Sequence, residues 1–216
     1  WQLRLSFGET ARSGDVVARL TGAVASNGSF VLGPVDLTIG AGDRVAIVGH
    51  NGSGKSTLLD VVLGRRPLDA GDRWFGPGVV VGELEQRREQ LSDDVTVLAA
   101  FMAATGMLVP EARTLLAKFG IGAGEVDRPT VSLSPGERTR LVLALLMATG
   151  TNCIVLDEPT NHLDLPAIEQ LEQALDAFGG TVLLVTHDRA LLESVRLTRT
   201  IRLEAGKVVA DAPVGA

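Results

Sequence analysis

The chain has 216 residues, of which 45% are hydrophobic and 21% are charged, and its net charge is −6. This hydrophobic share excludes a disordered chain, and basic residues interspersed with acids give no charge-based sign of nucleic-acid binding. No apolar run approaches the roughly 18 residues that a membrane-spanning helix needs. Cys153 is the only cysteine, so no intramolecular disulfide can form, and we expect a packed side chain in a protein of a reducing compartment.

The N-terminal part of the chain is predicted to consist of short strands and one helix. Residues 55–63 predict the helix, which ends at Gly64 because glycine readily takes the left-handed conformation found after a helix. Residues 40–43 predict a turn before a short buried strand. Alternating or continuous apolar runs bounded by turn residues predict strands at 2–7, 16–23, 35–39, 44–48 and 79–84.

The middle of the chain is predicted to be helical, and strands return in the last third. Asp188 is expected to cap a short helix that runs to Val195, and residues 204–206 are predicted to form a hairpin turn. The other predicted helices are 95–107, 110–119, 136–148 and 166–178, and the other strands are 154–156, 181–185, 201–203 and 207–209. Strands separated by helices imply a mostly parallel sheet, so the predicted fold class is α/β.

Two adjacent carboxylates, Asp157 and Glu158, follow the predicted buried strand at 154–156. In open α/β sheets, ligands bind beyond the carboxyl ends of the strands. Asp157 is therefore a candidate magnesium ligand, and Glu158 can orient or deprotonate a water molecule. Two acids at a strand end are also compatible with simple turn chemistry, so the pair does not decide the function alone.

Residues 49–57, with the sequence GHNGSGKST, match the phosphate-binding loop pattern between a buried strand and a helix. Glycines let backbone N–H groups converge on a polyphosphate, and the helix N-terminus adds positive potential. Lys55 would contact the β- and γ-phosphates, and Ser56 would share a magnesium ion with Asp157 if their strands are neighbours. A glycine-rich turn with a chance lysine is the alternative that this context disfavours. The candidate nucleotide-binding residues are Gly49, Asn51, Gly52, Ser53, Gly54, Lys55, Ser56 and Thr57.

Residues 133–138, LSPGER, lie between the loop and the acidic pair. In this order and spacing the three motifs resemble those of ATP-binding-cassette (ABC) ATPases, over nearly the whole chain. The resemblance implies one ABC domain over residues 1–216. It would comprise a phosphate-loop parallel-sheet core, an antiparallel β-subdomain and a small helical subdomain at about residues 90–148. It also implies ATP and Mg²⁺ as cofactors.

The resemblance further assigns roles to single residues. Gln86 resembles the family's Q-loop glutamine, a catalytic and magnesium-site position, and His187 resembles its switch histidine. Asp164 falls at the D-loop. Alone, such residues are more often a surface glutamine or a loop histidine. The implied catalytic residues are Glu158, His187 and Gln86, the implied magnesium ligands are Ser56, Asp157 and Gln86, and the further nucleotide contacts are Ser134, Gly136 and Asp164.

Three stretches resemble the ABC-F subfamily in particular: 136–140 (GERTR), 161–164 (NHLD) and 186–189 (THDR). ABC-F proteins carry two cassettes, lack membrane domains and act on the ribosome, in translation or in antibiotic resistance. We therefore expect a cytoplasmic protein whose partners are a second cassette and the ribosome. The chain starts at Trp1 and lacks a long charged helical insertion, so we expect a fragment containing the second cassette. The alternatives are the ATPase subunit of a membrane transporter and a non-catalytic nucleotide-binding module.

Two positions depart from the family pattern. Pro135 stands where the family usually has glycine, and proline removes one backbone donor from the signature. Ser26 stands near the position of the aromatic residue that usually stacks on adenine. Phe30 is close enough in sequence to replace that aromatic residue, but a phenylalanine buried in the core is an equally good interpretation.

Overall fold

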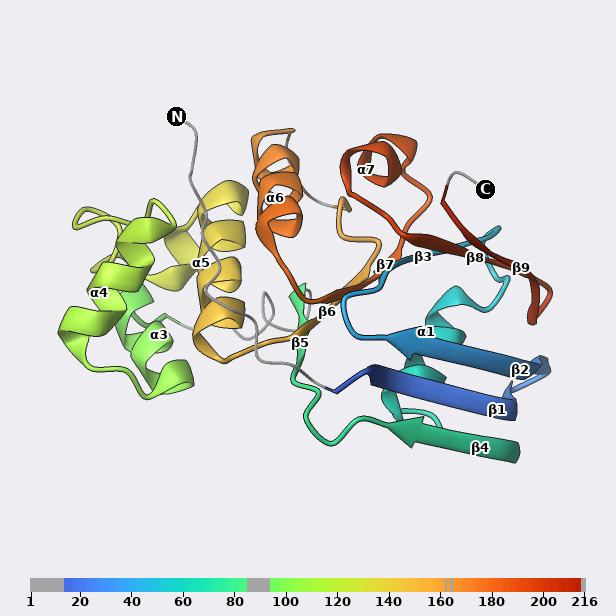
Figure 1. The fold of residues 1–216 in the computed structure, drawn as a ribbon. Coiled ribbons are helices and arrows are strands. Elements are labelled where there is room, and N and C mark those ends of the chain that lie inside the picture. Colours follow the sequence, from blue (N-terminus) through green and yellow to red (C-terminus); the bar gives the residue numbers. More distant parts are fainter. Residues whose placement is uncertain (1–13, 85–93, 162, 164, 215–216) are drawn as a thin grey trace. The chain divides into compact units, whose positions relative to one another are not determined.

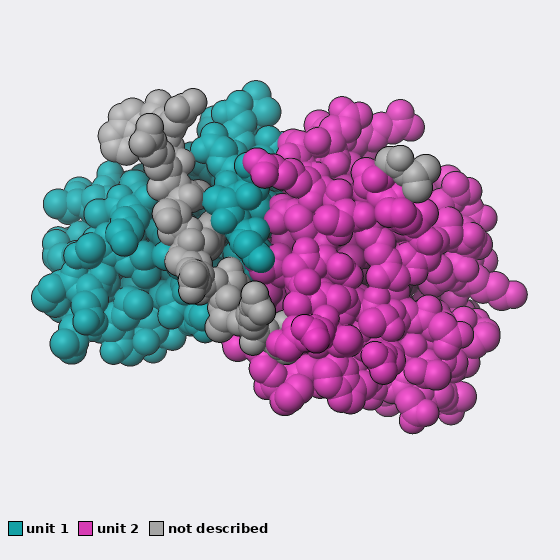
Figure 2. Space-filling model, in the orientation of Figure 1, with its two compact units in different colours: residues 1–11, 82–151, 159–179 teal, residues 12–81, 152–158, 180–216 magenta. Residues whose placement is uncertain are grey.

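A computed structural model describes residues 14–84, 94–161, 163 and 165–214. The chain forms two compact units (Figure 2). Unit 1 comprises residues 1–11, 82–151 and 159–179, and unit 2 comprises residues 12–81, 152–158 and 180–216. The predicted strand at 2–7 lies outside the described residues, as do Gln86, His162 and Asp164.

Unit 2 contains an antiparallel sheet of three strands in the order β2-β1-β4 (Figure 1). The strands are β1 (Val16–Asn27), β2 (Phe30–Gly40) and β4 (Ala70–Phe75). The first two were predicted, although the structure makes both longer. β4 was missed because it is an edge strand whose residues are almost all exposed, so its sequence shows no apolar alternation.

A second sheet in unit 2 has the order β6-β7-β3-β8-β9. Pairing is parallel from β6 to β8, and β9 is antiparallel to β8. The bounds are β3 (Arg44–Val48), β6 (Cys153–Asp157), β7 (Thr181–Val185), β8 (Arg199–Glu204) and β9 (Lys207–Pro213). The predicted α/β class with a mainly parallel sheet is confirmed.

One apolar core joins the two sheets of unit 2 to α1 (Lys55–Leu63). α1 begins and ends as predicted, with Gly64 in the left-handed conformation. Cys153 belongs to this core, and burial raises the pKa of its thiol to about 12, so it packs as a neutral side chain. The short α7 (Arg189–Ser194) begins after Asp188, whose carboxylate accepts hydrogen bonds from two backbone N–H groups.

Unit 1 is helical in its described part, and α5 packs against α3, α4 and α6 (Figure 1). Its elements are α3 (Val97–Thr105), α4 (Val109–Lys118), the 3₁₀ helix η1 (Thr130–Ser132), α5 (Pro135–Ala148) and α6 (Leu165–Ala177). The predicted helices differ from these by at most two residues at either end. β5 (Val81–Glu83) spans the boundary of the two units and is shorter than predicted.

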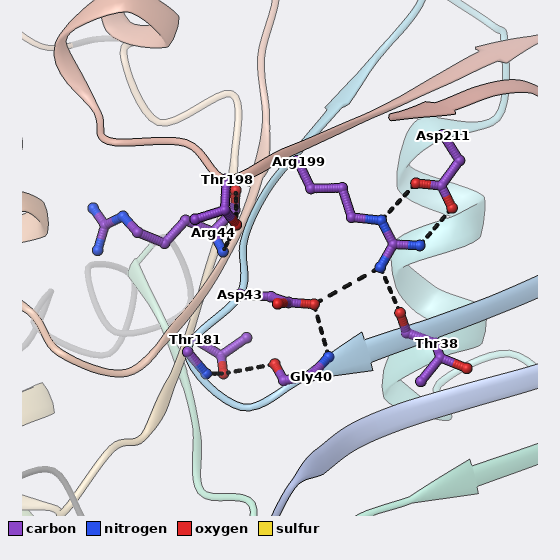
Figure 3. A network of polar contacts seen from close by, with 9 residues as sticks. Thr38, Gly40, Asp43, Arg44, Thr181, Thr198, Arg199 and Asp211 are labelled. Atoms are coloured by element: carbon purple, nitrogen blue, oxygen red, sulfur yellow. Dashed lines mark hydrogen bonds and ion pairs between the residues drawn. The ribbon is translucent and has the colours of Figure 1, made fainter. Parts of the chain in front are cut away.

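Arg199 fastens the β8–β9 hairpin to the antiparallel sheet of unit 2 (Figure 3). Its guanidinium makes a bidentate ion pair with Asp211 of β9, and it donates to the carbonyl of Thr38 in β2 at 2.6 Å. Asp43 lies 3.7 Å from the same guanidinium and accepts from the Gly40 N–H at 2.8 Å. The hydrogen bond to Asp211 raises the pKa of Arg199 against the opposing effect of burial.

No helix within the described ranges has the length and apolar character needed to cross a bilayer.

Candidate nucleotide site

The loop at residues 49–54 turns tightly around the side chain of Lys55 in unit 2. Lys55 is 8% exposed, and its ammonium donates to the carbonyls of Gly49 at 3.0 Å and His50 at 3.3 Å. A bond from the Ser53 N–H to the His50 carbonyl closes the loop at 3.0 Å. Lys55 is also the first residue of α1, so a buried cation lies at the positive end of a helix. This combination favours a polyanionic ligand.

A cavity of about 450 Å³ opens beside this loop, within the size range of small-ligand sites. Two segments far apart in the chain meet there, the loop with the start of α1 and the acidic pair after β6. Its lining residues are Asn27, Phe30, Asn51, Gly52, Gly54, Lys55, Ser56, Thr57, Asp157 and Glu158. The strands before Ser56 and Asp157 are not neighbours, because β7 lies between β3 and β6, so the condition for a shared magnesium ion is not met in that form. The cavity nevertheless brings both side chains to one space.

Glu158 has an unusual backbone, with a positive φ of 48° directly after β6. Its N–H donates to the Val185 carbonyl at 2.8 Å, which continues the pairing with β7 past the end of the strand. A non-glycine residue in this region costs about 1 kcal/mol or more, and such strain concentrates at functional sites. The strained turn places the carboxylate at the cavity rather than in the sheet.

Two residues after β7 hold the Glu158 carboxylate. His187 Nδ1 lies 2.8 Å from Glu158 Oε2, and the buried Thr186 hydroxyl is 3.5 Å from the same oxygen. The Thr186 hydroxyl in turn accepts from the Asp188 N–H at 3.1 Å. The His187 ring is mostly exposed, whereas the Glu158 side chain is only 21% exposed. A carboxylate anchored beside an imidazole can orient a water molecule and accept its proton.

The residues present fit a magnesium nucleotide. The backbone of the loop is a cradle, and Ser53 Oγ is buried in it with no hydrogen-bond partner among the described residues. The Ser56 hydroxyl and the Asp157 carboxylate are hard oxygen ligands on one cavity. In the described part of the chain, no three His, Cys, Asp or Glu side chains gather at a metal site. A metal ion would therefore complete its shell with phosphate and water oxygens, as Mg²⁺ commonly does.

The LSPGER stretch lies in unit 1, at the start of α5. The Ser134 hydroxyl accepts from the Glu137 N–H at 3.2 Å, and the Glu137 carboxylate accepts from the Ser134 N–H at 2.8 Å. These reciprocal bonds form a capping box, and Pro135 occupies the first helical turn, where a missing N–H is tolerated. The proline therefore fits the helix start without strain, and Gly136 keeps its N–H in the same turn.

Arg128 steadies this capping box from the preceding segment. It bonds Glu137 Oε1 at 3.0 Å and the Ser132 carbonyl at 2.6 Å. Burial raises the pKa of Glu137, but the hydrogen bonds from Ser134 and the charge of Arg128 outweigh burial and leave that pKa below its ordinary value. The ionised carboxylate is thus part of the structure at the start of α5.

Three residues at this site were missed or left open by the sequence. Asn27 lines the cavity from the end of β1, and the only sequence feature that singled it out was the turn dipeptide that it forms with Gly28. Phe30 both lines the cavity and packs on the core, so neither alternative for it excluded the other. Thr186 had no distinguishing pattern. Ser26 is not a lining residue, and its carbonyl accepts from Arg66 at 3.1 Å.

Known proteins share this arrangement. The family model described as ABC transporter matches residues 32–161. ABC transporter F family member 2 of Arabidopsis thaliana is 34% identical over 95% of the chain and 31% of its own length. The chain belongs to the ABC family, within the ABC-F group. As an ABC-F cassette it is an ATPase.

Bacterial relatives support the same family. The putative ATP-binding protein YdiF of Bacillus subtilis is 38% identical over 94% of this ABC-F chain and 32% of its own length. The ribosome protection protein VmlR of Bacillus subtilis is 37% identical over 77% of the chain and 30% of its own length. The chain thus spans about a third of the length of the relatives that it matches.

A solved structure confirms the fold. The dimeric structure of MJ0796, described as a bacterial ABC transporter cassette, has a TM-score of 0.74 at 22% identity. The match covers 92% of this chain and 99% of that chain.

The lowered pKa of Glu137 predicts an acid-dependent loss of stability. Its ionised form stabilises the fold above the ordinary glutamate pKa of about 4.3, and this contribution disappears as the pH falls through the lower pKa of the folded state. Urea unfolding from pH 7 to pH 3 should show that Glu137→Gln costs stability at neutral pH and little in acid. Arg128→Met keeps the carboxylate without its cation and should reduce the acid loss. A pH-independent difference between Glu137→Gln and the wild type would contradict this prediction.

Proposed function

We propose that this chain binds MgATP in the cavity of unit 2 and hydrolyses it together with a second cassette bound head to tail. The observation that supports this most strongly is that Lys55, Ser56, Asp157 and Glu158 line one cavity. These four supply a phosphate-binding cation, two hard oxygen ligands and a candidate base. The proposed domain is one cassette over residues 1–216 with a helical subdomain at about 90–148.

The loop and the first turn of α1 hold the phosphates in this proposal. Lys55 and the backbone N–H groups of residues 49, 51, 52, 54, 56 and 57 bind phosphate oxygens, and Ser53 adds its buried hydroxyl, because its N–H already bonds the His50 carbonyl. The Ser56 hydroxyl and Asp157 hold the metal, and Gln86, which lies outside the described residues, adds a third ligand directly or through water. When bound, Mg²⁺ supplies the positive charge that neutralises the phosphate oxygens.

Glu158 and His187 prepare the attacking water. The Glu158 carboxylate orients the water and accepts its proton at one of the two carboxylate oxygens. His187 Nδ1 lies 2.8 Å from Oε2 and fixes that oxygen. The exposed imidazole would contact the γ-phosphate. The strained backbone of Glu158 keeps the carboxylate in this position before the nucleotide arrives.

The signature residues serve the nucleotide of the partner cassette. Ser134 is exposed, and its hydroxyl accepts the Glu137 N–H, which leaves the hydroxyl proton to donate to a phosphate oxygen. The Gly136 N–H adds a backbone donor in the first turn of α5, while Pro135 adds none. Asp164, outside the described residues, would act at the same interface.

For the whole protein, we propose a cytoplasmic ABC-F protein in which this chain is the second of two cassettes. Its partner is the ribosome, and its role lies in translation or in resistance to ribosome-targeting antibiotics. Similarity to a ribosome protection protein supports this role, as do the NHLD and THDR stretches. The alternative is the ATPase domain of a membrane transporter. The description of the matching family model, "ABC transporter", supports this alternative.

Glu158→Gln should trap a closed pair of cassettes. The amide keeps the size of the carboxylate but cannot accept the proton, so MgATP stays bound between the two chains. Size-exclusion chromatography should show a dimer with MgATP and a monomer with MgADP or without nucleotide. Lys55→Ala in the same background is the control and should remain monomeric. A Glu158→Gln chain that binds MgATP tightly as a monomer would contradict the composite site.

A pull-down separates the two proposed roles. Full-length protein carrying Glu158→Gln should co-sediment with ribosomes in MgATP and be released in MgADP, because only the ATP state keeps the cassettes closed. Lys55→Ala should abolish this difference. Retention in a detergent-extracted membrane fraction, with no ribosome sedimentation, would reject the ribosomal role in favour of transport.

A further inference from the structure

The β8–β9 hairpin turn lies directly against the phosphate loop. Glu204 pairs with Lys207, which leaves Ala205 and Gly206 as a two-residue turn. Both have positive φ, 45° and 80°, as a type I′ turn requires. Alanine is strained at such a φ, so the conformational preferences of Ala205 and Gly206 do not stabilise the turn by themselves, and contacts outside the turn contribute.

Gly206 is bonded on both sides of its backbone. Its N–H donates to the carbonyl of Ser53 in the phosphate loop at 3.0 Å. Its carbonyl accepts from the N–H of Gly33 in β2 at 2.8 Å. One residue of the turn therefore connects the loop to the antiparallel sheet, and all three belong to unit 2.

No space remains for side chains at these contacts. A Cβ on Gly206 would overlap the Val31 carbonyl oxygen, and a Cβ on Gly49 would overlap the carbonyl oxygen of Leu203 in β8. A Cβ on Gly54 would lie 2.7 Å from Cζ of Phe30. The loop is thus in backbone contact with the hairpin on one side and with an aromatic edge on the other.

The far end of the hairpin is fixed independently. Arg199 joins Asp211 within the hairpin and donates to Thr38 in β2 (Figure 3). β2 thus holds the hairpin at its base through Arg199 and at its turn through Gly33. The turn can therefore act as a rigid support.

We propose that Gly206 and Phe30 are positioning residues for phosphate binding. The Ser53 carbonyl and the Gly54 N–H belong to one trans peptide, so they point in opposite directions. Gly206 fixes the carbonyl, and this turns the Gly54 N–H away from the hairpin, while the edge of Phe30 prevents Gly54 from moving. Gly54 lines the cavity, so the support aims a donor at a bound phosphate. This inference rests on the proposed function of the cavity.

Gly206→Ala tests the support. Gly42→Ala is the matched control, because Gly42 has a φ of 81°, close to that of Gly206, but open space around its Cα. Both variants carry the same backbone strain, and only Gly206→Ala displaces Val31 and the turn. Calorimetric titration with MgATP and with magnesium tripolyphosphate, which has no base, should show at least about tenfold weaker binding for Gly206→Ala only.

Asp211→Asn separates positioning from stability. It weakens the ion pair at the base of the hairpin, away from the loop, so it should lower the melting temperature with little change in either affinity. Phe30→Leu is the second loop variant, which decides the question if Gly206→Ala does not fold. It should weaken tripolyphosphate binding as well as MgATP binding, whereas loss of a base contact would weaken MgATP alone.

The proposal is overturned if Gly206→Ala binds tripolyphosphate like Gly42→Ala, or if Asp211→Asn loses as much affinity as Gly206→Ala. It is also overturned if Phe30→Leu leaves tripolyphosphate binding unchanged. Lys55→Ala distinguishes a failure of the proposed nucleotide site from a failure of the proposed loop support. If Lys55→Ala retains full MgATP affinity, the proposed function fails, whereas if only Lys55→Ala loses affinity, the support alone fails.

Discussion

The structure of unit 2 depends on one constraint, the absence of space for side chains beneath the phosphate loop. At the loop, Gly49 meets the carbonyl oxygen of Leu203 in β8, and Gly54 meets the ring of Phe30, at distances that exclude a Cβ. Because the loop lies against these neighbours, Gly49 and Gly54 have little room to move even without a ligand. A phosphate site of this kind gains affinity because the loop need not become ordered when it binds. The parallel sheet then adds Asp157 and Glu158 at the end of β6.

The phosphate loop and the signature each lie at the N-terminus of a helix, in different units. The loop precedes the N-terminus of α1 in unit 2, and the signature spans the N-terminus of α5 in unit 1. Each end is prepared differently. At α1 the side chain of Lys55 folds back over the loop, whereas at α5 the Glu137 carboxylate and Arg128 lock a capping box. An exposed serine hydroxyl remains at each start, on Ser56 and on Ser134.

Sequence patterns predicted most of the fold, because buried strands and helices carry apolar periodicity. α1 and β7 were predicted to the residue, whereas β4 was not, since an exposed edge strand has no such pattern. Motifs also identified the loop and the acidic pair. Contacts between distant segments left no local signal, so the intervening β7, the Thr186 contact and the role of Gly206 required the structure.

We propose that each complete ATP site needs the loop of one cassette and the signature of another. Mixing two inactive variants tests it most directly. Lys55→Ala removes the phosphate-binding cation and keeps the signature, whereas Ser134→Arg blocks the signature and keeps the cation, so a mixed pair contains one intact site. At concentrations where the wild type hydrolyses ATP, each variant alone should be inactive and the mixture should recover activity. An inactive mixture, or full activity of either variant alone, would contradict the account.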